Sequence, residues 1–206
     1  IVEFNGRYDG SSRFPNGNRY GFFPSASAAW RVDQESFMQP LENFWSTFKL
    51  RASYGSLGNQ SVSPFGYIAT MSAFPSNHLI GGIRPQRVTP PGLVSPNYTW
   101  EEVATLNFGA DLGFFGDRLM VNFDIYERNT TGMLTLGREL PGVLGASEPR
   151  ENAADLQNRG WELSLNYRDE VLLGGSPLSY GTRFVLSDSR AYITGFANPN
   201  RNLTQF

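Results

Sequence analysis

Hydrophobic and polar residues alternate along several stretches of this chain, and the alternating apolar positions that define one face carry no charge. Near the start, Phe4, Gly6 and Tyr8 alternate with Asn5 and Arg7. A period of two places successive side chains on opposite faces of a β-sheet. The pattern therefore predicts strands that have one apolar face and one polar face.

The same alternation recurs in seven segments. We expect strands at residues 1–10, 20–33, 46–57, 103–114, 118–129, 160–169 and 178–190. Residues 34–44 lack the alternation and are compatible with a short helical turn. A strand of about ten residues, at ~3.4 Å per residue and tilted by ~45°, rises roughly 24 Å, which matches the ~25 Å apolar band of a membrane β-barrel. The predicted fold is all-β, an antiparallel transmembrane β-barrel of which this chain supplies about seven strands.

The connections between these segments are unequal in length. Residues 115–118 and 170–177 are short and contain Gly, whereas 58–102 and 130–159 are long and rich in Pro and Gly. Bacterial barrels carry short turns on the periplasmic side and long loops outside. We therefore expect 58–102 and 130–159 to be extracellular and 34–45 to be periplasmic.

Composition narrows the function classes. The chain has 206 residues, a net charge of −2 and no cysteine, so electrostatic attraction to nucleic acid, disulfides and thiolate chemistry are not expected. The chain has no run of about 18 apolar residues, so a transmembrane helix is not expected.

The chain begins at Ile1 without Met or a signal peptide, and an odd number of strands with open edges cannot close a barrel. We expect residues 1–206 to be a fragment of one β-barrel domain.

Several short motifs occur in an order that resembles the SusC/RagA family of TonB-linked (TonB-dependent) outer-membrane transporters. They span nearly the whole chain and lie at residues 4–14, 18–31, 50–55, 58–60, 99–101, 107–111, 124–126 and 158–162. The motif at 158–162, for example, reads Asn-Arg-Gly-Trp-Glu.

The resemblance implies a larger protein with an N-terminal plug and a 22-stranded barrel, of which this chain covers a late portion. The plug domain and the final strands would be absent. The resemblance also implies import of oligosaccharides or peptides at the bacterial outer membrane. The implied partners are a SusD-like lipoprotein, TonB through the absent N-terminal region, and membrane lipid, with no nucleic acid and no cofactor.

Charged residues on the polar faces are candidates for contact with the barrel lumen or the plug. They are Arg7, Arg31, Lys49, Arg51, Asp111, Asp124, Glu162 and Arg183. The alternative is that they form ion pairs between strands and only hold the barrel together, because buried charges need partners in either case.

Aromatic residues in the loop 58–102 are candidates for contact with substrate or lid, because sugars stack on flat rings. They are Phe65, Tyr67, Tyr98 and Trp100. The alternative is that these rings pack a small core within the loop itself.

Catalysis and metal binding have weak signals. His78 is the only histidine and no metal-ligand spacing surrounds it. Glu101, Glu102, Glu148 and Glu151 could bind Ca²⁺ between loops, but solvated loop charges are the better explanation of them. We expect a protein that is not an enzyme. Two alternatives stay open: an outer-membrane enzyme barrel, and a soluble, glycan-binding β-sandwich in which the uncharged face is a covered core.

Overall fold

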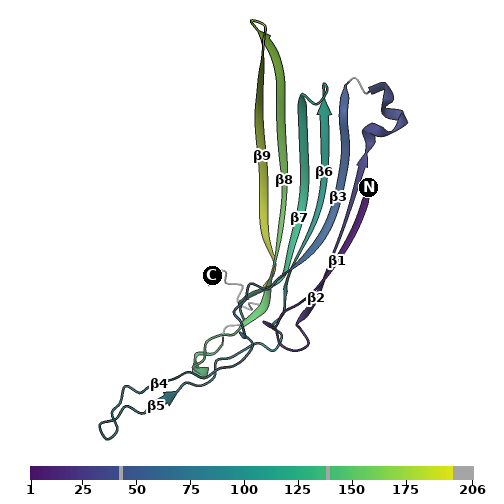
Figure 1. Ribbon diagram of the computed structural model, residues 1–206. Helices are drawn as coiled ribbons and strands as arrows, with labels where there is room; N and C mark the ends of the chain where they lie inside the picture. The colour runs from purple at the N-terminus through teal and green to yellow at the C-terminus, as the bar shows by residue number, and fades with distance from the viewer. Residues whose placement is uncertain (42–43, 138–139, 197–206) are drawn as a thin grey trace.

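One antiparallel sheet makes up most of the molecule. The computed structural model describes residues 1–41, 44–137 and 140–196 (Figure 1). Seven strands pair in the order β1-β2-β3-β6-β7-β8-β9, each antiparallel to its neighbour. Their bounds are Val2–Gly10, Tyr20–Arg31, Trp45–Asn59, Glu101–Phe114, Leu119–Leu136, Arg150–Leu173 and Ser176–Phe196. The expected all-β antiparallel architecture with seven strands is confirmed, as an open sheet.

The strands are longer than the alternation predicts at the end of the sheet that carries the long connections. β7 runs to Leu136 and β8 begins at Arg150. The expectation of a long irregular loop over 130–159 is therefore wrong, and only 137–149 lie between these two strands. Where both faces of a strand meet water, the strand can stay hydrogen-bonded to its neighbours without an apolar face. The period of two then disappears from the sequence while the hydrogen-bonded ladder continues.

Small elements occupy the connections. The expected helical turn after β2 is present as two 3₁₀ segments, η1 Val32–Gln34 and η2 Ser36–Leu41, and η3 covers Gly142–Leu144. The loop after β3 contains a pair of short strands that the sequence did not predict, β4 Ala73–Pro75 and β5 Gln86–Val88. This hairpin extends away from the end of the sheet as an arm (Figure 1). No helix of the described residues is long and apolar enough to cross a membrane.

One face of the sheet is apolar and uncovered. Cross-strand neighbours on this face form rows such as Leu112, Val121, Leu165 and Phe184. Large side chains on this face are widely exposed, including Phe4 at 78% and Phe184 at 55%. In the described part of the chain, no second sheet or helical layer packs on it. This single layer differs from the β-sandwich alternative, in which a second sheet would cover the apolar face.

Aromatic rings gather at the end of the sheet that has the short turns. The Phe44 ring lies 5.4 Å from Phe114 and 5.7 Å from Phe115, and Trp45 lies 4.6 Å from Phe114. Such a cluster is typical of the aromatic girdle at a membrane interface. Trp161 lies near the start of the strand expected at 160–169, but it is an internal residue of β8, which begins at Arg150.

Candidate functional site: a charged network on the polar face

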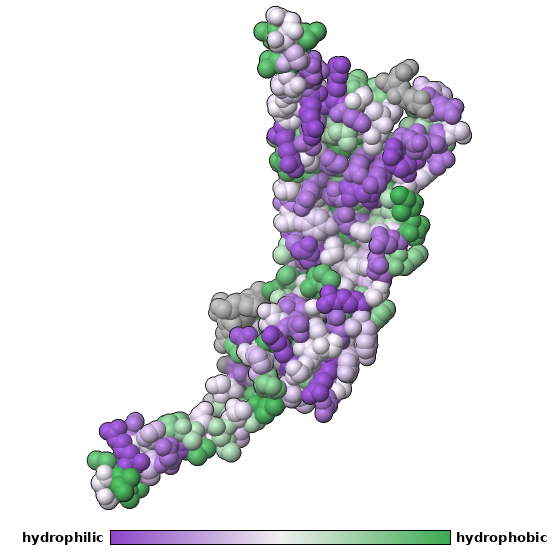
Figure 2. Space-filling model, in the orientation of Figure 1, coloured by the Kyte–Doolittle hydropathy of each residue, from purple (hydrophilic) through white to green (hydrophobic). Residues whose placement is uncertain are grey.

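The cross-strand register places all eight candidate charged residues on one face of the sheet, opposite the apolar rows. Lys49 is the direct partner of Asp111, and Asp124 is the direct partner of Glu162. Figure 2 shows hydrophilic side chains gathered in a band across the visible part of the sheet.

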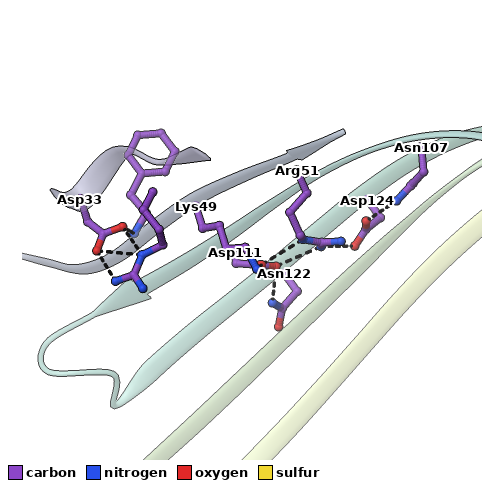
Figure 3. A network of polar contacts seen from close by, with 9 residues as sticks. Asp33, Lys49, Arg51, Asn107, Asp111, Asn122 and Asp124 are labelled. Carbon is purple, nitrogen blue, oxygen red and sulfur yellow. Dashed lines mark hydrogen bonds and ion pairs between the residues drawn. The ribbon is translucent and has the colours of Figure 1, made fainter. Parts of the chain in front are cut away.

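Arg51 is the centre of a network that joins three strands (Figure 3). Its Nε and Nη2 donate to the two Asp111 carboxylate oxygens at 2.9 and 3.0 Å. The same Nη2 donates to Asp124 Oδ2 at 2.9 Å. A guanidinium is suited to this task because its planar fork can engage two carboxylates at once. The network therefore ties β3, β6 and β7 together through side chains as well as through the backbone ladder.

Gly109 makes room for this bridge. It lies on β6 between Arg51 and Asp124, as the direct register partner of both residues. A Cβ atom at this position would lie 2.5 Å from Asp124 Oδ1 and 2.6 Å from Arg51 Nη2. The absence of a side chain is what lets Arg51 reach across β6. Sequence reasoning missed this role, because a single glycine within a strand does not identify which side chains pass over it.

Amide side chains complete the network. Asn122 donates to Asp111 Oδ1 at 2.9 Å, and Asn107 donates to Asp124 Oδ1 at 2.9 Å. Lys49 Nζ lies 3.8 Å from Asp111 Oδ2. Two cations and two carboxylates balance, and the side chains of Asp111 and Asp124 are only 17% and 25% exposed. The cluster offers a rigid, neutral, hydrogen-bonded surface rather than an activated acid, base or nucleophile.

The other four candidate residues stand apart from this network. Arg7 pairs with Asp9 two positions along the same strand, at 2.7 Å, and Arg31 pairs with Asp33. Within the part of the chain that the structure describes, Glu162 and Arg183 form no ion pair. Glu162 lies directly opposite Asp124, so two carboxylates are neighbours on this face. The structure thus brings Lys49, Arg51, Asp111 and Asp124 into one cluster and leaves the rest distributed along the sheet.

Asp33 organises the turn after β2. The Arg31 guanidinium donates to it at 2.8 Å, the Gln34 amide at 2.9 Å and the Phe48 backbone N–H at 3.3 Å. Asp33 is buried. The hydrogen bond from Arg31 holds the pKa of Asp33 well below its usual range, although burial acts in the opposite direction. The carboxylate therefore fastens the 3₁₀ turn to the start of β3.

Two of the four candidate loop aromatics form a small core around Phe14. The Phe14 ring is fully buried and lies 4.9 Å from Trp100 and 5.9 Å from Tyr98, which is 5% exposed. Trp100 Nε1 donates to the Arg19 carbonyl at 3.1 Å, and burial raises the pKa of the Tyr98 hydroxyl. These rings join the loop after β1 to the base of the long loop after β3. The sequence did not single out Phe14, which lies in a short polar loop.

The other two loop aromatics are closer to solvent. Phe65 is 58% exposed and Tyr67 is partly exposed. Further along the same loop, the tip of the arm exposes Leu79 at 66%, Ile80 at 70% and Ile83 at 72%. Ile80 and Ile83 close the tip by pairing with each other. The arm therefore presents an apolar end, a feature that sequence reasoning missed.

The described residues hold no group of three or more His, Cys, Asp or Glu side chains that could bind a metal ion. His78 lies in a turn, where its backbone N–H donates to Ser76 Oγ at 3.0 Å. Glu101 accepts from Asn59 at 3.2 Å and Glu102 accepts from Ser56 at 2.7 Å.

A single-layer antiparallel sheet, apolar on one side and tied by a charged network on the other, defines a segment of a membrane β-barrel. Residues 1–204 match the family model described as TonB dependent receptor-like, beta-barrel. The chain belongs to this family.

Relatives and solved structures agree with this family. TonB-dependent receptor P3 of Formosa agariphila is 37% identical over 169 residues, which are 82% of this chain and 16% of that protein. TonB-dependent receptor SusC of Bacteroides thetaiotaomicron is 31% identical over 83% of this chain and 17% of its own length. The structure of the RagAB peptide importer in its closed-closed state aligns with a TM-score of 0.76 at 26% identity, over 95% of this chain and 20% of that one. The chain thus spans about a sixth of the curated relatives it matches, and these are named as receptors rather than enzymes.

Proposed function

We propose that this chain forms part of the wall of an outer-membrane transporter that imports large nutrients with energy from TonB. One observation carries the proposal: the sheet has a wide apolar face that nothing in the described residues covers, and its other face is polar and internally paired. This division is what a barrel needs when lipid lies on one side and water, a plug or a substrate on the other. TonB would act through parts of the protein outside this chain.

The connections support one orientation of the sheet in the membrane. The turns at 115–118 and 174–175 are short, whereas 60–100 and 137–149 are long and lie at the opposite end of the strands. Short turns face the periplasm in outer-membrane barrels, so the arm would project from the cell surface. Its apolar tip, with Leu79, Ile80 and Ile83, is suited to bind a protein rather than water. We assign it to contact with a SusD-like surface lipoprotein.

The substrate would be an oligosaccharide or a peptide. The peptide alternative is supported by the RagAB structures, which are named as a peptide importer. Tyr98 and Trp100 are buried in the loop core, so Phe65 and Tyr67 are the better candidates for direct contact with substrate or lid. Arg183 and Glu162, which form no ion pair among the described residues, are the candidates on the polar face.

The test uses the full-length protein in its native host. Replacing Leu79, Ile80 and Ile83 by Ser should abolish co-purification of the surface lipoprotein and reduce growth on the imported nutrient. A control replaces Val143 and Leu144 by Ser, because these side chains are also widely exposed but lie in the other long connection. Deletion of the full gene without any defect in nutrient uptake would refute the transport proposal.

A further inference from the structure

A groove on the apolar face has an unusual charged rim. It lies over β6 to β9, with a volume of about 730 Å³. Its floor is apolar and includes Leu106, Phe108, Ile125 and Trp161. Its rim carries two arginines from adjacent strands, Arg159 and Arg190, together with the carboxylates of Glu127 and Asp188. All of these side chains stand on the face that the proposed function assigns to lipid.

The two arginines are direct cross-strand partners. Like charges directly opposite each other destabilise a sheet unless an anion lies between them. Arg159 pairs with Glu127 at 2.9 Å, and its side chain is still 61% exposed. Arg190 forms no ion pair among residues 1–41, 44–137 and 140–196. Glu127 also accepts from Asn129 and Gln157 at 3.0 Å each, so its carboxylate is already shared among three donors.

The height of this arginine pair agrees with the level of lipid headgroups. On β8, Asp169 and Arg159 stand on the same face and limit an uncharged stretch that contains Trp161, Leu163, Leu165 and Tyr167. Ten residues at ~3.4 Å per residue and ~45° tilt give roughly 24 Å, close to the ~25 Å apolar band of barrels. Arg159 and Arg190 therefore lie just outside the hydrocarbon, with Trp161 at the interface where its ring is favoured.

From these positions we infer that Arg159 and Arg190 bind the phosphate of a phosphorylated lipid in the outer leaflet, with an acyl chain lying over Phe108, Ile125 and Trp161. Guanidinium groups are well matched to phosphate because they can donate two parallel hydrogen bonds. The inference rests on the orientation in the proposed function, which puts this end of the strands at the cell surface. The apolar floor below the arginines favours a lipid phosphate over a free one.

Asp188 allows a second test of the inference. It stands on the same face as Arg190, two residues along β9, directly opposite Trp161. Its carboxylate repels a phosphate at the arginine pair. Removing its charge should therefore strengthen binding, whereas removing the Arg190 charge should weaken it.

The experiment measures lipid retention on the purified full-length transporter by native mass spectrometry, with diphosphorylated lipid A as the probe. Arg190→Gln should lower the affinity at least about tenfold, and Asp188→Asn should raise it. Arg128→Gln is the matched control, because Arg128 follows Glu127 in the chain but stands on the opposite face. It should leave lipid retention unchanged.

Three results would overturn the inference. Equal loss of lipid in the Arg128 and Arg190 variants would show a general charge effect. Displacement of the probe by inorganic phosphate alone would assign the arginines to a free anion. A change in oligomeric state of the Arg190 variant with unchanged lipid retention would assign the groove to a second copy of the protein. Nutrient uptake is measured separately, so a failure of the lipid site is distinguishable from a failure of the transport proposal.

Discussion

Arg51 Nη2 lies 2.9 Å from the Asp124 carboxylate although a whole strand, β6, runs between them (Figure 3). The residue of β6 at this point is Gly109, and the guanidinium passes over the space that a side chain would fill. The polar face is therefore held together by contacts that skip a strand.

Gly109→Ala should destabilise the barrel, because the added methyl group would displace the Arg51 and Asp124 side chains from each other. We expect a loss of about 1–3 kcal/mol, the usual cost of inserting a methyl group into a filled site. Heat-modifiability of the full-length protein on gels would measure it. Gly55→Ala is the control, since a Cβ there meets nothing closer than Ser25 Cβ at 3.6 Å. Equal stability of the two variants would contradict this account of Gly109.

Asp33→Asn should lower stability by about 1–2 kcal/mol near neutral pH, because it removes a charged acceptor from a partly exposed pair with Arg31. The pKa of Asp33 is lowered in the folded protein. Its stabilisation is therefore complete above the unfolded-state pKa of about 4 and is lost as the pH falls toward the folded-state pKa. The difference in melting temperature between wild type and variant should be constant from pH 5 to 8 and shrink below about pH 4. A difference that grows in acid would contradict the assignment.

A charge on the apolar face should be far more costly than the same charge one residue away. Leu163→Arg places a guanidinium among Phe123 and Leu186, its cross-strand neighbours, and should cost about 2–4 kcal/mol at the membrane midplane. Ser164→Arg points to the polar face and should be tolerated. Folding yield of the two full-length variants into lipid vesicles measures the contrast. Similar yields would show that lipid does not cover this face.

Phe14→Ala should loosen the long loop after β3 without unfolding the sheet. Truncating a fully buried Phe costs about 3–5 kcal/mol, and the rings that lose contact are Tyr98 and Trp100. Limited proteolysis should then cut within 60–100 faster than in the wild type. Phe65→Ala, which truncates a 58% exposed ring, is the control and should leave the cleavage rate unchanged.

The alternation of residues was sufficient to find every strand of the large sheet and to sort its faces. Leu163 and Ser164 show why: a membrane barrel places neighbouring residues in hydrocarbon and in a polar interior, so each position is strongly selected. The same reasoning failed at 130–136 and 150–159, where both faces of the strands meet a polar environment and no such selection acts. A helical turn was located within 34–44, but the 3₁₀ segment at Asp33, which fell in the expected strand 20–33, and its attachment to Phe48 were not.

Some features of the candidate site could likewise be predicted from the sequence, and others only from the structure. That Arg51, Asp111 and Asp124 share one face follows from sequence parity alone. Other contacts depend on which residues stand opposite each other on neighbouring strands. They are the ion pairs of Arg51 across Gly109, the packing of Tyr98 and Trp100 against Phe14, and the pairing of Arg159 with Arg190. Register is decided by the whole sheet, because each pairing must satisfy its backbone ladder and both faces together. The order of residues along the chain therefore determined strands, faces and family, whereas only the assembled sheet decided which side chains meet.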